Sequence, residues 1–379
     1  MPAPPPADVQ LWATTTGGGH LRVAAALRDA LKAEAGRELR VEIADPLSSG
    51  ALPQAGLLLR GYGPLVRWAP AAWGPLFDAF SRPRAQGILE RFLLTGLRAP
   101  MVRRARRSRP AVVVNLHPLL GPGARAAAQA VGAPLLTMVT DLTLVHPGWL
   151  SPRGTPLLTP SREAAASCLA QGVSPELVET TGLPVDPALE AGGPREEIRR
   201  RLGLDPRLPC LLVSGGAEGA GGVSRVLLEV EASRAICQVA LLCGRNRRLL
   251  SWASRRRWSM PVRPLPFLED PGPWVLAADV YLGKAGPTAI AEAAAAGVAL
   301  VLTSALRGQE QANLEWAQRT GLALGALGPG EVARLLPRLL ENDGEALRPL
   351  RAAARRELEA GAAARTARRI LAAGGLSSR

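Results

Sequence analysis

A histidine near the start of the chain directly follows a run of glycines. The apolar and β-branched run Val9–Thr15 leads into Gly17, Gly18 and Gly19, and His20 comes next. Glycines allow a backbone to approach a bound molecule closely, and imidazole is the side chain best suited to take up a proton near neutral pH. This context predicts that His20 acts as a base in a ligand cleft.

The other two histidines lie in different surroundings. His117 precedes Pro118 where a strand is expected to end, and His146 lies in the loop Asp141–Trp149 after another expected strand. A single histidine in such a position makes a structural hydrogen bond more often than it takes part in catalysis. The residues alone therefore predict a structural role for both.

A second glycine-rich loop, Ser214–Gly222, lies between an expected strand and an expected helix. Backbone N–H groups of such a loop can bind an anion where the positive end of the helix begins. The loop has neither the GxGxxG spacing of dinucleotide-binding folds nor the terminal Gly-Lys-Ser/Thr of a P-loop. By itself it indicates an anion site or, as the alternative, a flexible turn.

The segment Gly283–Glu292 carries a more specific pattern for a phosphorylated ligand. Pro287 suits the first position of a helix, so Thr288 would lie beside free N–H groups, and Lys284 would add positive charge. Glu292 follows Thr288 by four residues and shares its helix face. A carboxylate there can accept two hydrogen bonds from a diol such as ribose; the alternative is a carboxylate on the helix surface.

Amides and a carboxylate open the next expected helix, in the segment Gly308–Asn313. These groups suit a ligand with several hydroxyls, and they again follow the carboxyl end of a strand. Ligands of open α/β sheets bind at that edge. Three loops thus offer contacts to phosphate, a diol and a sugar, which predicts a site for a nucleotide sugar.

Two series of alternating strands and helices must position these loops. Apolar runs separated by helical segments are typical of parallel sheets covered on both faces, and the boundary between the series is expected near residues 184–194. The expected strands are Val9–Thr15, Leu39–Ala44, Ala111–Leu116 and Leu135–Thr140 in the first series, and Cys210–Ser214, Val239–Cys243, Val280–Gly283 and Ala299–Thr303 in the second.

Composition and charge limit the classes of protein. The 379 residues include 46 Lys+Arg and 32 Asp+Glu, a formal net charge of +14 that attracts anions such as phosphorylated substrates or an anionic membrane. Nucleic acid is not an expected partner, because the basic residues are spread rather than interleaved with aromatics. The cysteines form no CxxC pair, so we expect neither a disulfide framework nor a metal site. The sequence shows no secretory signal and no apolar run long enough to span a membrane.

The segment Gly56–Arg109 interrupts the first series with apolar and aromatic residues, scattered arginines and the basic run Met101–Arg107. Apolar and aromatic side chains with basic flanks suit a surface at an anionic membrane interface. The alternative is one or two amphipathic helices that pack on the sheet.

Seven ordered motifs span both series. They are TTTGGGH (Thr14–His20), TDLTLVHPGW (Thr140–Trp149), TGLPVDP (Thr181–Pro187), VSGGAEGAGG (Val213–Gly222), CGRN (Cys243–Asn246), KAGPTAIAEA (Lys284–Ala293) and GQEQANLEW (Gly308–Trp316). Together they resemble the monogalactosyldiacylglycerol synthase family of GT-B glycosyltransferases, which is related to the lipid-linked N-acetylglucosamine transferase of peptidoglycan synthesis.

The resemblance implies an α/β GT-B fold, in which two Rossmann-like βαβ domains face each other across a cleft. Residues 1–190 would form the acceptor and membrane-facing domain and 191–345 the donor domain, with helices in 346–379 packing back toward the first domain. It implies His20 as the catalytic base, alternatively assisted by Asp141. Gly18, Gly19 and His146 would lie on the acceptor side.

The resemblance also implies which residues of the second domain bind the donor. The diphosphate contacts would be Gly215, Gly216, Gly219, Lys284, Gly286, Pro287 and Thr288. The nucleoside contacts would be Arg245, the Phe267 backbone and Glu292, and the sugar side would be formed by Gln309, Glu310 and Asn313.

The implied reaction is a single in-line displacement with inversion, which moves a hexose from a UDP-sugar to a lipid hydroxyl without a metal or other cofactor. Diacylglycerol is the expected acceptor, and the expected place is the cytoplasm, peripheral on the inner face of an anionic membrane. Two alternatives remain open: a UDP-N-acetylglucosamine transferase acting on a polyprenyl-linked acceptor, and a UDP-sugar epimerase of the same fold.

Overall fold

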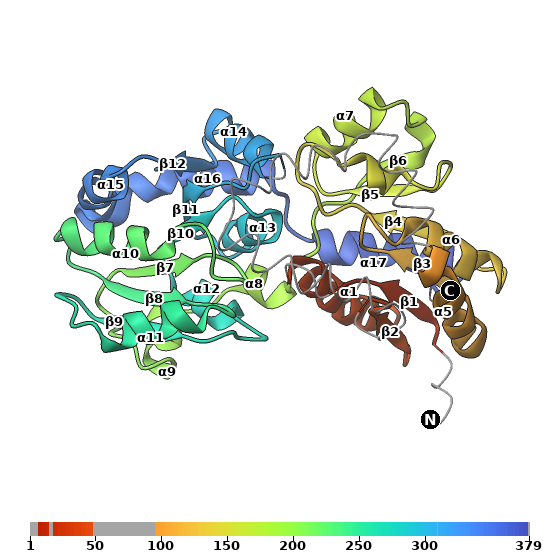
Figure 1. Cartoon of the computed structure of the whole chain (residues 1–379), viewed down its shortest axis with the longest axis horizontal. Coiled ribbons are helices and arrows are strands. Elements are labelled where there is room, and N and C mark those ends of the chain that lie inside the picture. The colour runs from red at the N-terminus through yellow and green to blue at the C-terminus, as the bar shows by residue number, and fades with distance from the viewer. Residues whose placement is uncertain (1–6, 15–17, 48–94, 309, 378–379) are drawn as a thin grey trace. The chain divides into compact units, whose positions relative to one another are not determined.

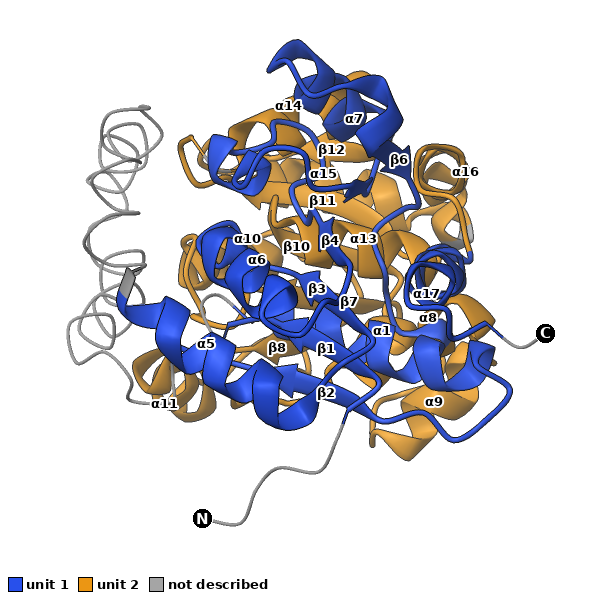
Figure 2. Ribbon diagram, turned by 90° about the vertical axis from the view of Figure 1, so that its right-hand side faces the viewer, with its two compact units in different colours: residues 1–64, 75–187, 361–379 blue, residues 65–74, 188–360 orange. Residues whose placement is uncertain are grey.

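The computed structural model describes residues 7–14, 18–47, 95–308 and 310–377. Contacts divide the chain into two compact units (Figure 1), coloured separately in Figure 2. Unit 1 holds the described residues up to Pro187 together with those from Gly361 onward, and unit 2 holds Ala188–Ala360. Each unit contains one parallel six-stranded sheet with helices on its faces, as the alternating apolar and helical segments predict.

In unit 1, the strands lie in the order β2-β1-β3-β4-β5-β6. Their bounds are β1 (Val9–Trp12), β2 (Val41–Ala44), β3 (Val112–Asn115), β4 (Leu135–Met138), β5 (Leu157–Thr159) and β6 (Val178–Thr180). Every residue of β1 and β3 is buried, including the polar Gln10 and Asn115, and this burial accounts for the mainly apolar sequence of the two strands. The chain order reverses between β1 and β3, and such a reversal opens a crevice at the carboxyl edge of a sheet.

The helices of unit 1 pack closely on this sheet. They are α1 (Gly19–Glu34), α5 (Thr95–Ser108), α6 (Gly121–Gln129), α7 (Arg162–Ala170) and α17 (Ala362–Ala373), with short 3-10 turns η2 (Pro147–Leu150) and η3 (Pro175–Leu177). Leu97, Met101 and Ala105 of α5 are spaced by four residues and buried in the core. For α5, therefore, the interpretation as a packed amphipathic helix is confirmed. Of the segment expected at a membrane, residues 56–94 lie outside the described residues.

The last helix of the chain completes unit 1. Thr366 of α17 donates a hydrogen bond from its hydroxyl to Thr181 Oγ1 at 2.9 Å, and Arg368 pairs with Glu34 of α1 at 3.0 Å. Residues 346–379 are thus divided between the two units, because α16 (Arg348–Glu357) belongs to unit 2.

In unit 2, the strands lie in the order β12-β11-β10-β7-β8-β9. Their bounds are β7 (Cys210–Ser214), β8 (Gln238–Leu242), β9 (Val262–Leu265), β10 (Val280–Lys284), β11 (Ala299–Ser304) and β12 (Ala323–Gly325). The helices are α8 (Pro187–Ala191), α9 (Arg195–Arg201), α10 (Val223–Ala232), α11 (Arg247–Arg255), α12 (Gly272–Ala277), α13 (Pro287–Ala295), α14 (Gln311–Arg319) and α15 (Glu331–Leu340), together with the turn η4 (Asn342–Leu347) and α16. Here the chain order reverses between β7 and β10. The glycine-rich loop Ser214–Gly222 follows β7, and the start of α13 follows β10.

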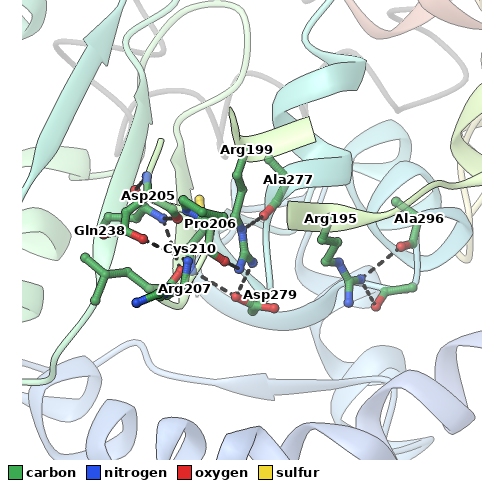
Figure 3. A network of polar contacts seen from close by, with 12 residues as sticks. Arg195, Arg199, Asp205, Pro206, Arg207, Cys210, Gln238, Ala277, Asp279 and Ala296 are labelled. Atoms are coloured by element: carbon green, nitrogen blue, oxygen red, sulfur yellow. Dashed lines mark hydrogen bonds and ion pairs between the residues drawn. The ribbon is translucent and has the colours of Figure 1, made fainter. Parts of the chain in front are cut away.

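A buried arginine–carboxylate pair fixes the amino ends of β7 and β10 (Figure 3). Arg199 of α9 is 6% exposed and donates to Asp279 Oδ2 at 2.5 Å and to the Ala277 carbonyl at 2.9 Å. The same Asp279 oxygen accepts the backbone N–H of Cys210, the first residue of β7, at 2.8 Å. Charge-assisted hydrogen bonds of this kind are strong, so they hold together the two strands whose opposite ends carry the candidate site.

Two observations on the described ranges complete the fold. None of their helices is both long and apolar enough to cross a bilayer. Within those same ranges, no group of three or more His, Cys, Asp and Glu side chains is placed to hold a metal ion.

Candidate functional site

His20 lies in the first turn of α1, at the carboxyl edge of the unit 1 sheet. Gly18 caps the helix with φ +77°, a left-handed conformation that favours glycine, and Gly19 is the first helical residue. Nδ1 of His20 lies 3.2 Å from the Thr140 hydroxyl. Burial lowers the pKa of His20 to about 4, although a hydrogen bond with the Leu116 backbone opposes the shift. The ring is therefore uncharged at neutral pH and can accept a proton.

All three histidines of the sequence gather at this edge. The rings of His20 and His117 meet edge to face with their centroids 4.7 Å apart, and the Trp149 ring lies 5.9 Å from His20. Burial, and then the nearby His20 and His146, hold the pKa of His117 well below its usual value.

The residues alone predict a structural role for His117 and do not reveal its contact with His20. The signal that could have found it is topology, because His20 follows β1 and His117 follows β3, where the chain order reverses.

The carboxylate of Asp141 holds the loop that follows β4. Its Oδ2 accepts hydrogen bonds from the backbone N–H of His146 at 3.1 Å and from the indole N–H of Trp149 at 2.9 Å. Nδ1 of His146 in turn accepts the N–H of Gly148 at 3.1 Å. Burial raises the pKa of Asp141 to about 6, and the two hydrogen bonds oppose this shift. These bonds shape the loop beside His20; a part for Asp141 in proton transfer stays a prediction.

In unit 2, three glycines give the loop after β7 a shape that larger residues do not fit. A Cβ at Gly215 would lie 2.2 Å from a backbone oxygen of the same loop, and a Cβ at Gly219 would lie 2.2 Å from the Cys243 carbonyl oxygen. Gly216 has φ +70°, and a Cβ there would lie 2.8 Å from Cε of Lys284. The loop backbone therefore approaches the end of β10 directly, and this closeness explains the glycine run in the sequence.

The amino end of α13 faces the same place. Gly286 is its N-cap, and Pro287 and Thr288 are its first two residues, as the sequence predicts. The first N–H groups of a helix have no acceptor within it. The side-chain amide of Asn313, which is 2% exposed, donates to the Ala285 carbonyl at 3.1 Å and so fixes the connection between β10 and α13.

The charged side chains of this edge are paired with one another. Lys284 forms an ion pair with Glu310, whose Oε2 accepts the backbone N–H of Leu306 at 3.1 Å. The two side chains that the resemblance assigns to diphosphate and sugar therefore lie together. Gln309, which is assigned to the sugar, lies outside the described residues.

Glu292 lies within the protein rather than on its surface. It is 7% exposed on α13. The alternative interpretation, a carboxylate on the helix surface, is therefore wrong. The resemblance assigns this carboxylate to the ribose of the donor, and that role stays a prediction.

Arg245 and Phe267, both assigned to the nucleoside, contact each other. The Arg245 guanidinium lies 4.2 Å from the centroid of the Phe267 ring and pairs with Glu218 of the glycine loop at 3.1 Å. The backbone N–H of Arg245 also donates to the Ala217 carbonyl at 2.8 Å. The ring of Phe267 remains 40% exposed and so offers a face to a ligand.

Ser304 is a further polar residue of this edge that the sequence reasoning missed. It is the last residue of β11, and in the part of the chain that the structure describes its buried hydroxyl oxygen has no hydrogen-bond partner. A Cβ at Gly221 would lie 2.5 Å from this oxygen. The hydroxyl thus points at the glycine loop, where an anionic ligand could satisfy it.

Comparison with known families gives two matches. The family model described as monogalactosyldiacylglycerol (MGDG) synthase matches residues 20–185. The model described as glycosyltransferase family 28 C-terminal domain matches residues 210–319. The histidine cluster lies within the first match, and the glycine loop, α13 and Glu310 lie within the second.

Individual relatives agree with these matches. The probable monogalactosyldiacylglycerol synthase 2, chloroplastic, of Oryza sativa subsp. indica is 31% identical over 344 residues, which cover 87% of this chain and 73% of the rice protein. Monogalactosyldiacylglycerol synthase 1, chloroplastic, of Arabidopsis thaliana is 29% identical, over 87% of this chain and 64% of that protein. Among solved structures, MurG of Acinetobacter baumannii superposes with a TM-score of 0.61 at 18% identity, over 97% of this chain and 100% of MurG. At that identity the likeness shows the fold alone.

Proposed function

Because the chain belongs to the monogalactosyldiacylglycerol synthase family of GT-B glycosyltransferases, we propose that it transfers a hexose from a UDP-sugar to the free hydroxyl of diacylglycerol at a membrane surface. The observation that carries this proposal is the extent of the match. The rice relative aligns with 87% of the chain, and the two family models together include both groups of candidate residues.

On the acceptor side, His20 takes the proton of the attacking hydroxyl. Its ring is uncharged at neutral pH and is held by Thr140 on one side and by aromatic neighbours on the other. A base with a low pKa suffices when the hydroxyl becomes strongly acidic, which happens as its oxygen bonds to the anomeric carbon. Attack opposite the leaving group gives inversion at that carbon.

On the donor side, the protein stabilises the negative charge that develops on the leaving UDP. The glycine loop after β7 and the amino end of α13 present backbone N–H groups, and Lys284 adds a positive charge beside both. Glu292 accepts the ribose hydroxyls, Arg245 and Phe267 contact the uridine, and Glu310 and Asn313 line the sugar side. Fixed dipoles of this kind need no rearrangement during the reaction.

A basic face of unit 1 supports contact with an anionic membrane. Arg98 and Arg106 of α5, with Gln129 of α6, line a groove of about 460 Å³ between the two helices. Basic residues near an anionic surface each contribute about 1 kcal/mol to binding.

In flotation with phosphatidylglycerol vesicles, the double variant R98A/R106A should bind more weakly than wild type. The control R200A/R201A, on exposed α9 residues of unit 2, should bind as wild type does.

A transfer assay tests the proposed reaction. The protein is incubated with radiolabelled UDP-galactose, UDP-glucose or UDP-N-acetylglucosamine and with vesicles that contain diacylglycerol, and the lipids are then extracted. We expect label from at least one UDP-hexose in a lipid that depends on diacylglycerol. Label that stays water-soluble with all three donors contradicts a lipid acceptor.

The same assay separates the two alternatives. Transfer of N-acetylglucosamine to an added polyprenyl-linked sugar, without transfer to diacylglycerol, would identify the first alternative. Conversion of the UDP-sugar to its epimer with no lipid product would identify the second.

A further inference from the structure

The contact between His20 and His117 joins a residue of the proposed mechanism to one for which the sequence predicts only a structural role. We propose that His117 is a positioning residue that holds the imidazole of His20 in the orientation required for proton transfer. This inference rests on the proposed function, in which His20 takes up the proton of the acceptor. His117 itself need not touch the acceptor.

His117 is anchored on both its backbone and its ring. Its backbone N–H donates to Asn115 Oδ1 at 3.2 Å, and its carbonyl accepts the N–H of Leu120 at 3.0 Å. Its ring atom Nδ1 accepts the backbone N–H of Leu119 at 3.2 Å. The side chain is 6% exposed. With its backbone bonded on both sides and its ring bonded at Nδ1, the buried side chain is suited to act as a rigid wall.

The hydrogen bond from Leu119 also fixes the protonation of His117. Because Nδ1 accepts a hydrogen, it carries none of its own, and the neutral ring must hold its proton on Nε2. Protonation of Nδ1 would break this bond in a buried place. His117 is therefore suited to a constant structural task beside His20 and is poorly suited to exchanging protons itself.

His20 depends on its neighbours for its orientation. Its ring hydrogen-bonds to the Thr140 hydroxyl at 3.2 Å and to the backbone of Leu116, and these two bonds set the direction of its nitrogens. The His117 ring, with its centroid 4.7 Å away, and the Trp149 ring at 5.9 Å pack against the imidazole and restrain its tilt about those bonds. A displacement of about 1 Å at a reacting group can reduce a rate by about 100-fold. Loss of the nearer ring should therefore slow turnover.

A double-mutant cycle tests this inference with the full chain, labelled UDP-hexose and diacylglycerol vesicles. We expect H117A to lower kcat by about 10- to 100-fold while the KM for the UDP-sugar changes less than about twofold. H117F keeps an aromatic ring and should recover much of the lost kcat. In the H20A background, H117A should change the residual rate by less than about twofold, because a positioning residue has nothing left to position.

The outcomes separate this inference from the proposed function. An unchanged kcat in H117A would overturn the positioning role. An equal fall of the rate when H117A is added to the wild-type and to the H20A background would also overturn it, and would indicate that His117 acts directly or supports the fold alone. Full turnover in H20A would instead remove His20 as the base, and the positioning role would fall with it. If H117A is unfolded by circular dichroism, H117F decides: a kcat within about threefold of wild type supports the inference, and a loss as large as that of H20A overturns it.

Discussion

Lys284 and Glu310 form an ion pair at the carboxyl edge of the unit 2 sheet, next to the amino end of α13. A Cβ at Gly286, the N-cap of α13, would lie 3.2 Å from the Lys284 ammonium nitrogen and 3.5 Å from a Glu310 carboxylate oxygen. Glu310 is 1% exposed and is also bonded to the backbone of Leu306. The pair therefore holds the ammonium group, with its carboxylate partner, where the helix presents its N–H groups.

The first prediction concerns this lysine. In K284A, the affinity for UDP measured by calorimetry should fall by about 10- to 100-fold, because a hydrogen bond to a charged group contributes about 1.5–3 kcal/mol. The chain offers a matched control, since its only other lysine, Lys32, is exposed on α1 of unit 1. K32A should bind UDP as wild type does. Equal affinities of K284A and wild type would show that the ammonium group does not contact the diphosphate.

Glu292 allows ribose recognition to be separated from phosphate recognition. E292Q weakens the acceptor of the diol hydrogen bonds without removing the side chain, so UDP should bind about tenfold more weakly. Inorganic pyrophosphate, which has no ribose, should bind equally well to E292Q and wild type. E315Q, on an exposed residue of α14, serves as the control. A parallel loss of affinity for UDP and pyrophosphate would argue against a ribose contact.

The two arginines that flank α11 provide an internal control for Arg245. Both Arg245 and Arg256 lie over an aromatic ring, at 4.2 Å from Phe267 and 4.9 Å from Trp258, and both pair with a glutamate. The resemblance assigns Arg245, and not Arg256, to the nucleotide. We expect R245A to bind UDP several-fold more weakly and R256A to bind it normally. Two variants with the same UDP affinity would remove Arg245 from the nucleotide site.

Protonation of the histidine cluster should set the stability of the protein in acid. Burial lowers the pKa of His20 to about 4 from 6.5, and it also lowers the pKa values of His117 and His146. Between the folded and unfolded pKa values of a histidine, the unfolded chain binds more protons than the folded chain. The stabilisation that comes from keeping these buried histidines uncharged is therefore present above pH 6.5 and is lost as the pH falls toward 4. Asp141 acts in the opposite direction, because burial raises its pKa from 3.8 to about 6.

Melting temperatures measured from pH 7 to pH 4.5 check this balance. H20N should flatten the fall of Tm toward acid, since one buried neutral histidine is removed. D141N should make the fall steeper, because it removes the carboxyl group that holds a proton in the folded state. Identical slopes in wild type and both variants would contradict the assigned burial effects.

The sequence predicts the parts of the site that are local in the chain. The left-handed Gly18 before His20 and the Gly286-Pro287 start of α13 follow from the conformational preferences of single residues. The parallel sheets follow from apolar runs such as residues 112–114 of β3. Local chemistry of this kind depends on a few neighbouring residues and can be found without knowledge of the tertiary structure.

Contacts between distant segments could not be predicted in the same way. His117 lies against His20 only because β1 and β3 are neighbours in the sheet, and the strand order is a tertiary property. The burial of Glu292 likewise depends on how α13 packs, and the amide of Asn313 is used by a loop 28 residues away. The short strands β5 and β6 lack a long apolar run and have no counterpart among the expected strands.

The most direct test of the account compares turnover and donor binding in H20A. We expect transfer of labelled hexose to diacylglycerol to fall by about 100- to 10,000-fold, the usual contribution of a general base, while the dissociation constant for UDP stays within about twofold of wild type. Transfer at the wild-type rate in H20A would contradict the account, because the proton of the acceptor would then be taken by another group.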